Sequence, residues 1–156
     1  MRAKTVAQSQ SILSEVMMPV YANHYGSVHG GTILKLVDEA AFVAATKHCR
    51  RNVVTASLDS LEFRHPVNVG DVLTLKASVF NVGRTSMDVE VDIRAEKIKA
   101  GKVVRVGSAY LTMVALDAQG SPVKVPGLVL KTKEEIRKNK EIKQKRQKRI
   151  QQFLRP

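Results

Sequence analysis

Hydrophobic and polar positions divide the chain into one apolar helix, a series of strands and a charged final segment. Residues 32–48 contain neither glycine nor proline and are rich in alanine and leucine, a composition that favours a helix. On a helical wheel Lys35, Glu39 and Thr46 cluster on one narrow edge, and apolar side chains cover most of the remaining circumference. Because a helix that is apolar on nearly every side is buried, we expect this helix to be central and wrapped by other elements.

The segment before this helix is less regular. Residues 1–8 look like a loose start, whereas residues 9–18 predict a strand. Pro19 ends that strand, since proline cannot donate to a sheet ladder. Residues 20–31 contain three glycines, an asparagine and two histidines, which indicates a loop. Thr32, or either glycine before it, is the expected N-cap of the helix.

Strands follow the helix. Residues 85–96 alternate between apolar and charged side chains, the pattern of a strand with one face in water. The other strands are expected at 53–65, 72–80 and 102–116, with a short edge segment at 123–125. The turns between them are short, which favours an antiparallel meander. The predicted fold class is therefore α+β, with an antiparallel sheet of five or six strands curled around the helix.

Size and composition narrow the class of protein. The 156 residues suit one compact domain, which we expect at residues 1–130, followed by a basic helical tail at 131–156. No stretch approaches about 18 consecutive apolar residues, so no membrane span is expected. Cys49 is the only cysteine, which excludes a disulfide scaffold. The N-terminal region has no apolar signal-peptide core, so a cytoplasmic location is expected.

The net charge of +12 and the isoelectric point near 10.1 are unusual. Residues 131–156 contain 11 Lys or Arg and 3 Asp or Glu, so this last sixth of the chain carries +8 of the excess. A strongly basic chain suggests nucleic-acid binding. Aromatic residues make up only 4%, however, and no nucleic-acid motif is present. Specific nucleic-acid binding is not expected, and a basic tail alone would bind non-specifically and with strong salt dependence.

Asp38 is the first candidate for chemistry. Ideal helical spacing places it beside Leu34, Phe42 and Ala45. Burial of a carboxylate in such surroundings raises its pKa and prepares it as a base or nucleophile. The alternative is a boundary residue that Lys35 or a hydroxyl group holds in place.

The loop before the helix supplies further candidates. Gly30 and Gly31 lie where the first free N–H groups of the helix should point outward, and such groups can stabilise an oxyanion; the alternative is a tight entry turn. Asn23 could orient a carbonyl or a water molecule, or it could form an Asx turn. His24 and His29 have no cysteine or acidic partner at metal-ligand spacing, so no metal site is expected.

Four segments together resemble the hotdog-fold acyl-CoA thioesterases, in particular the cytosolic acyl-CoA hydrolase group of bacteria and the brain-type enzyme. They are NHYGSVHGGTILKLVDEAA at 23–41, VTASLDSLEFRHPVNVGD at 54–71, VGRTSMDVEV at 82–91 and AYLTMVALD at 109–117. The resemblance covers most of residues 10–130 in the same order. It implies a hotdog fold, in which an antiparallel sheet wraps a long helix, and hydrolysis of acyl-CoA thioesters to free fatty acid and CoA.

The resemblance also implies roles for residues. Asp38 would be the catalytic carboxylate, Asn23 its partner from the other chain of a dimer, and the Gly31 N–H the group that polarises the thioester carbonyl. Contacts to CoA would come from the two motif strands and their surroundings, at Ala56, Ser57, Leu58, Thr85, Ser86 and Met87, with Arg64 as a further phosphate contact. Among the basic residues of the tail, Arg146 and its neighbours Lys145, Lys148 and Arg149 suit contact with the CoA phosphates; the alternative is a solvated, partly helical tail.

The same resemblance implies an assembly and a cofactor requirement. Two subunits would join their sheets in a homodimer, and three dimers would form a hexamer. No cofactor is expected, because CoA enters as part of the substrate. Two other functions remain open from the sequence: a hotdog regulator that binds acyl-CoA without catalysis, and nucleic-acid binding through the basic tail.

Overall fold

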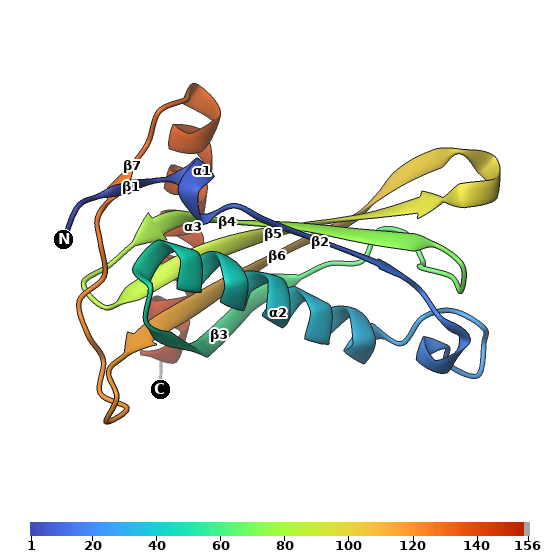
Figure 1. The fold of residues 1–156 in the computed structure, drawn as a ribbon, viewed down its shortest axis with the longest axis horizontal. Coiled ribbons are helices and arrows are strands. Elements are labelled where there is room, and N and C mark those ends of the chain that lie inside the picture. Colours follow the sequence, from blue (N-terminus) through green and yellow to red (C-terminus); the bar gives the residue numbers. More distant parts are fainter. Residues whose placement is uncertain (155–156) are drawn as a thin grey trace.

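A computed structural model describes residues 1–154 of the chain. Its centre is a five-stranded, fully antiparallel sheet in the order β2-β4-β5-β6-β3. The strands are β2 Ser11–Val16, β3 Asn52–Leu61, β4 Val72–Val82, β5 Ser86–Lys97 and β6 Lys102–Leu116. The helix α2, Gly30–Cys49, lies across one face of this sheet, called the inner face from here on (Figure 1). The predicted α+β class and the helix wrapped by an antiparallel sheet are therefore confirmed.

The main core fills the space between α2 and the inner face. Alternate residues of β5 supply Val89, Val91 and Ile93, and α2 contributes Val37 and Ala41, all completely buried. The alternation of apolar and polar residues in a strand selects this face. Small alanines on the buried side of α2 let the helix approach the sheet closely.

The prediction that α2 is buried on nearly every side is wrong for the single chain. Leu34, Phe42 and Val43 are about two-fifths exposed, on the side of α2 that faces away from the sheet. A five-stranded sheet is too narrow to surround a 20-residue helix, so it covers only one side of it. The apolar residues on the other side remain available for contact with another subunit.

The helix also begins earlier than predicted. Its N-cap is His29, which makes no side-chain cap hydrogen bond, and Gly30 is already the first helical residue. The His29 carbonyl accepts hydrogen bonds from the N–H groups of Thr32 and Ile33. Thr32 therefore lies inside the first turn rather than at the cap.

A second helix, α3 Lys133–Phe153, packs on the opposite, outer face of the sheet (Figure 1). Ile142 of α3 is 3% exposed and joins Phe80, Tyr110 and Val6 in a second apolar cluster. The prediction that β5 has one face in water is consequently wrong near the start of that strand. Asp88 and Glu90 are buried there, because α3 covers them.

The N-terminus is ordered, which corrects the expectation of a loose start. Lys4–Thr5 (β1) pairs in parallel with Leu128–Val129 (β7), and the one-turn helix α1, Val6–Ser9, follows with a capping box at Thr5. Residues 123–125 form no strand, although Val123 N–H and Val125 N–H bond to the Ala115 and Arg84 carbonyls. Two 3₁₀ turns, Pro19–Tyr21 and Ile98–Ala100, complete the elements. Within residues 1–154, no helix combines the length and apolar character that crossing a membrane requires.

Candidate active site

Asp38 and Thr55 face each other between α2 and the sheet. The Thr55 hydroxyl lies 2.5 Å from Asp38 Oδ1 and donates to it. Thr55 comes from β3, the strand at the edge of the sheet, and its hydroxyl also lies 3.4 Å from Met113 Sδ. The contact orients the carboxyl group and leaves Oδ2 available for a further partner.

The surroundings of Asp38 differ from the expected apolar burial. Within the single chain Asp38 is exposed, because the helix side that it shares with Leu34 and Phe42 has no cover. An apolar hollow of about 420 Å³ borders it, lined chiefly by Ile12, Leu13, Phe42 and Val43. Asp38 is thus a carboxylate at the margin of an apolar surface, where both water and an apolar chain can reach it.

Gly31 lies in the first turn of α2. It is exposed, and a side chain at this position would meet no atom within 4 Å. The first N–H groups of a helix have no acceptor within the helix, and the helix dipole makes them favourable partners for negative charge. A second hollow of about 300 Å³ adjoins this turn, and its lining includes Gly30, Ile33 and Arg64. Arg64 is therefore placed close to the start of α2.

Asn23 uses its side chain within its own loop. Its Oδ1 accepts from the Tyr25 N–H at 2.9 Å and from the Ser27 hydroxyl at 3.2 Å, while its Nδ2 lies 3.0 Å from the same hydroxyl. This is the Asx turn named as the alternative. The contacts of Asn23 and those of Asp38 are separate within one chain, so the structure does not bring these two candidates together.

The candidates on β3 lie around two irregularities of that strand. Thr55 is opposite Met113 and Ser57 is opposite Thr112, which leaves Ala56 as an extra, bulged residue. Ala56 and Leu58 are exposed on the edge strand. The hydroxyl oxygen of Ser57 is buried and has no hydrogen-bond partner within residues 1–154.

The candidates at the start of β5 form a second group. Thr85 is half-buried, Ser86 is buried, and the side chain of Met87 is completely buried in the core. Arg146 of α3 lies beside this group. A Cβ atom built at Gly83 would lie 2.8 Å from the Ser86 hydroxyl and 3.7 Å from Arg146 Nη1, so both side chains border Gly83. The structure therefore places Ser86 and Arg146 together, beside Gly83, where an added side chain would require the Ser86 hydroxyl to move.

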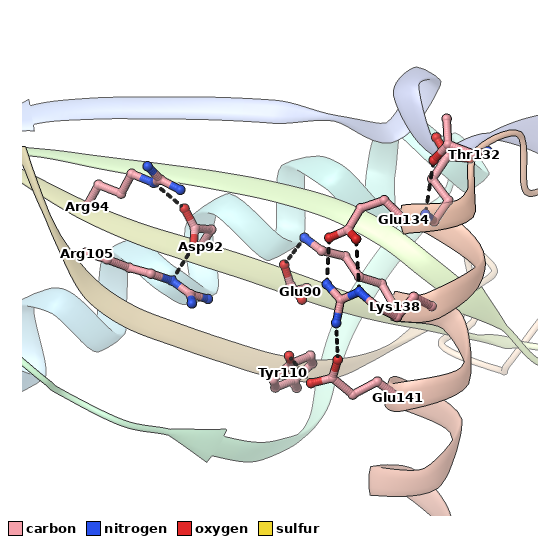
Figure 2. A network of polar contacts seen from close by, with 11 residues as sticks. Glu90, Asp92, Arg94, Arg105, Tyr110, Thr132, Glu134, Lys138 and Glu141 are labelled. Carbon is pink, nitrogen blue, oxygen red and sulfur yellow. Dashed lines mark hydrogen bonds and ion pairs between the residues drawn. The ribbon is translucent and has the colours of Figure 1, made fainter.

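Ion pairs tie α3 to the outer face. Arg146 Nη1 lies 3.1 Å from Asp88 Oδ2, and the Asp88 carboxylate also accepts from Asn81 and Thr112, both at 2.7 Å. Lys138 pairs with Glu90 at 2.6 Å (Figure 2). The basic residues of α3 that face the sheet are thus matched to buried acidic residues, which explains why a strongly charged helix packs there.

The pair Asp59–Arg149 continues this row of ion pairs. Arg149 Nη1 lies 3.0 Å from Asp59 Oδ1 in an ion pair that does not have hydrogen-bond geometry, and the Asp59 side chain is only 11% exposed. Burial raises the pKa of Asp59, and Arg149 opposes that shift. In the sequence, Asp59 interrupts the strand expected at 53–65 and otherwise looks ordinary, since its partner lies 90 positions away along the chain.

Thr55 was also missed, although it stands directly before the Ala56 and Ser57 candidates. A threonine in a β-branched strand is ordinary, and only the packing of α2 on β3 shows that its hydroxyl reaches Asp38. Within residues 1–154 no cluster of His, Cys, Asp or Glu could hold a metal ion.

The chain matches a known family. Residues 25–102, half of the chain, match the family model described as the thioesterase superfamily. The chain is 36% identical to an uncharacterized acyl-CoA thioester hydrolase, YkhA of Bacillus subtilis, over 83% of this chain and 75% of that protein.

Solved structures show the same similarity. The apo form of a hexameric acyl-CoA thioesterase superposes with a TM-score of 0.95 and 35% identity, covering 99% of this chain and 100% of that one. An acyl-CoA hydrolase of Staphylococcus aureus, solved with butyryl-CoA, CoA and CoA disulfide, gives a TM-score of 0.90 and 34% identity, covering 97% and 93%. Alanine variants of the S. aureus protein at an asparagine, an aspartate and a threonine have been solved as well.

Proposed function

Because the chain belongs to the thioesterase superfamily, we propose that it hydrolyses acyl-CoA thioesters, with Asp38 as the catalytic carboxylate. The observation that carries the proposal is the Asp38–Thr55 hydrogen bond beside an apolar hollow. The geometry supplies an oriented carboxylate at the margin of a surface that suits an acyl chain.

The S. aureus variants support this choice of residues. In that hydrolase the substituted asparagine, aspartate and threonine are separated by 15 and then 17 positions. Asn23, Asp38 and Thr55 have the same two separations in this chain. Thr55 therefore joins the two residues that the sequence suggested.

The chemistry requires a polarised carbonyl and an activated water. We assign the first role to the Gly31 N–H, since a free N–H at a helix N-terminus stabilises the oxyanion of a tetrahedral intermediate. Asp38 has the second role and removes a proton from water as the water oxygen attacks the thioester carbon. The Thr55 hydroxyl holds the carboxylate in place during this step.

Collapse of the intermediate completes the reaction. The carbon–sulfur bond breaks, the electron pair leaves with sulfur, and the proton on Asp38 passes to the CoA thiolate. The products are a free fatty acid and CoA, and Asp38 returns to its ionised state. The scheme uses no cofactor, since CoA is part of the substrate.

Two groups of residues are proposed to hold CoA. One lies around the first bulge of β3 and at the start of β5, where the buried Ser57 hydroxyl has no partner within residues 1–154 and Ser86 lies beside Arg146. It comprises Ala56, Ser57, Leu58, Thr85, Ser86, Met87 and Arg146, with Met87 contributing only its backbone because its side chain is buried. The other is Arg64, next to the first turn of α2.

The active site is proposed to form between two subunits. Asn23 and Asp38 make separate contacts within one chain, so a partner is needed to bring them together. Within the described part of the chain, residues 1–154, the edge strand β3 pairs on one side only, with β6, and it exposes Val54 and Leu58. A second copy that pairs with β3 would extend the sheet and cover the exposed side of α2; three such dimers would form the hexamer.

Hydrolysis of a panel of acyl-CoA chain lengths tests the proposed activity. Wild-type protein should release CoA, and Asp38→Asn should lower kcat by about 10²–10⁴-fold. Glu96→Gln is the matched control, because it makes the same acid-to-amide change at an exposed position of β5 that does not line this hollow. An inactive wild type that still binds acyl-CoA would instead indicate the non-catalytic regulator.

Mixing two inactive variants tests the shared site. If Asp38 and Asn23 of one site come from different chains, subunits with Asp38→Asn and subunits with Asn23→Ala should together form dimers with one intact site. Random exchange should then restore about a quarter of the wild-type activity. If one chain supplies both residues, no activity should return.

A further inference from the structure

Side chains of strand β3 contact a helix on each face of the sheet. Thr55 faces α2 on the inner face, whereas Asp59 faces α3 on the outer face, where it meets Arg149. In a regular strand, residues four positions apart lie on the same face. Thr55 and Asp59 lie on opposite faces because the bulge at Ala56 shifts the alternation between them.

The register along β3 shows this shift. Ser57 pairs with Thr112, whose hydroxyl contacts Asp88 on the outer face, and Leu58 pairs with the buried Leu111 of the inner face. A second irregularity between Leu58 and Ser60 leaves Asp59 as another extra residue. Without these bulges, a strand that kept Thr55 on the inner face would also direct Asp59 toward the core.

The two bulges are the irregular points of a strand that otherwise pairs with β6 along its length. As the edge strand it pairs only with β6 among the strands of residues 1–154, and each bulged residue lacks regular pairing with that neighbour. The Asp59–Arg149 ion pair is largely shielded from solvent, with the two side chains 11% and 21% exposed. It joins the second bulge directly to α3, and α3 is in turn anchored to β5 through Arg146 and Asp88.

We propose that Arg149 is a positioning residue for the active site: its ion pair with Asp59 holds β3 in the bulged register in which Thr55 faces Asp38. The proposal rests on the proposed function, since it gives the C-terminal helix a role in the geometry of the catalytic carboxylate. Arg149 itself lies on the outer face, on the opposite side of the sheet from Asp38, and acts through β3.

A double-mutant cycle tests the proposal. Arg149→Gln should lower kcat for acyl-CoA hydrolysis by about tenfold or more, because a displacement of about 1 Å at a catalytic group can cost about 100-fold. In a Thr55→Val background the same substitution should have little further effect, since Thr55 no longer reaches Asp38. Arg149→Lys should restore most of the activity, because the pair uses a single nitrogen of Arg149.

Arg137→Gln is the matched control, since Arg137 forms ion pairs with Glu134 and Glu141 of its own helix and should leave kcat unchanged. Amide hydrogen exchange of residues 55–59 should quicken in Arg149→Gln and stay unchanged in Arg137→Gln. Should Arg149→Gln fold poorly, Asp59→Asn removes the same charge pair without changing size and should give the same result.

The proposal is overturned if Arg149→Gln and Asp59→Asn keep wild-type kcat, or if their losses add fully to that of Thr55→Val. It is also overturned if exchange in β3 stays unchanged. The hydrogen-exchange measurement does not depend on enzymatic activity. A wild type that hydrolyses no acyl-CoA would contradict the proposed function, and the exchange rates would still test whether Arg149 holds β3 in place.

Discussion

The hydroxyl of Thr55 donates a hydrogen bond of 2.5 Å to Asp38 Oδ1, across the space between strand β3 and helix α2. The two residues are 17 positions apart, and a loop and the end of the helix separate them. The hydrogen bond fixes one oxygen of an exposed carboxylate and leaves the other oxygen available to a water molecule.

Removal of the Thr55 hydroxyl should impair catalysis without preventing substrate binding. Thr55→Val keeps the shape of the side chain, and we expect kcat to fall about 10- to 100-fold, since a hydrogen bond to a charged group contributes about 1.5–3 kcal/mol. Thr55→Ser keeps the hydroxyl and should stay within a few-fold of wild type. Steady-state kinetics with one acyl-CoA test this role of the hydroxyl. Equal kcat values for Thr55→Val and Thr55→Ser would contradict it.

A charge on the edge of β3 should prevent dimer formation. Val54 is 46% exposed beside the free edge of the sheet, and Val54→Lys would place an ammonium group in the proposed interface. Light scattering should show a smaller species, with activity reduced at least about tenfold because the shared site is lost. Val103→Lys, at the far end of β6 and 56% exposed, is the comparison. An unchanged mass for Val54→Lys would exclude β3 as the interface.

The buried His48 should make the fold sensitive to mild acid. Its Nε2 donates to the Pro126 carbonyl at 2.9 Å, while its Nδ1 is buried without a partner within residues 1–154. Burial lowers the pKa of His48 below 6.5 in the folded chain. Below pH 6.5 the unfolded chain therefore binds a proton at His48 before the folded chain does. The contribution of neutral His48 to the free energy of unfolding is complete above pH 6.5 and is lost as the pH falls from 6.5 through the folded pKa.

Melting temperatures measured between pH 5 and 8 test this expectation. Wild type should lose stability on the acidic side, and His48→Gln, which can still donate to the Pro126 carbonyl but does not titrate, should show a flatter profile. His29→Gln is the comparison, since His29 is exposed. Identical profiles for wild type and His48→Gln would assign the acid sensitivity to other groups.

Helix α3 should be an integral part of the fold rather than a detachable tail. Ile142→Ala removes a side chain that is 3% exposed and packed in the cluster with Phe80 and Tyr110. We expect a loss of about 2–5 kcal/mol in the free energy of unfolding. Ile136→Ala, on the exposed side of the same helix, should change it by less than about 0.5 kcal/mol. Chemical denaturation measures the free energy of unfolding of both variants. Equal free energies for Ile142→Ala and Ile136→Ala would mean that packing of α3 does not stabilise the sheet.

Local sequence pattern determined much of the architecture. Absence of glycine and proline between residues 32 and 48, strict alternation along 85–96 and short turns predicted the helix, the strands and their antiparallel order. These features act over a few residues, because side-chain periodicity and turn chemistry are local properties. The four segments at 23–41, 54–71, 82–91 and 109–117 likewise indicated the family in combination.

Tertiary structure decided which faces are covered and which side chains meet. Asp88 looked like a residue in water until α3, some 50 positions further along, was found to cover it. Thr55 and Asp59 lie in the segment 54–71, but no local pattern indicates their partners; their roles arise because a bulge directs them to opposite faces, toward α2 and α3. Periodicity specifies the side of an element on which a residue lies; the partner on that side depends on packing between distant segments, which no local pattern encodes.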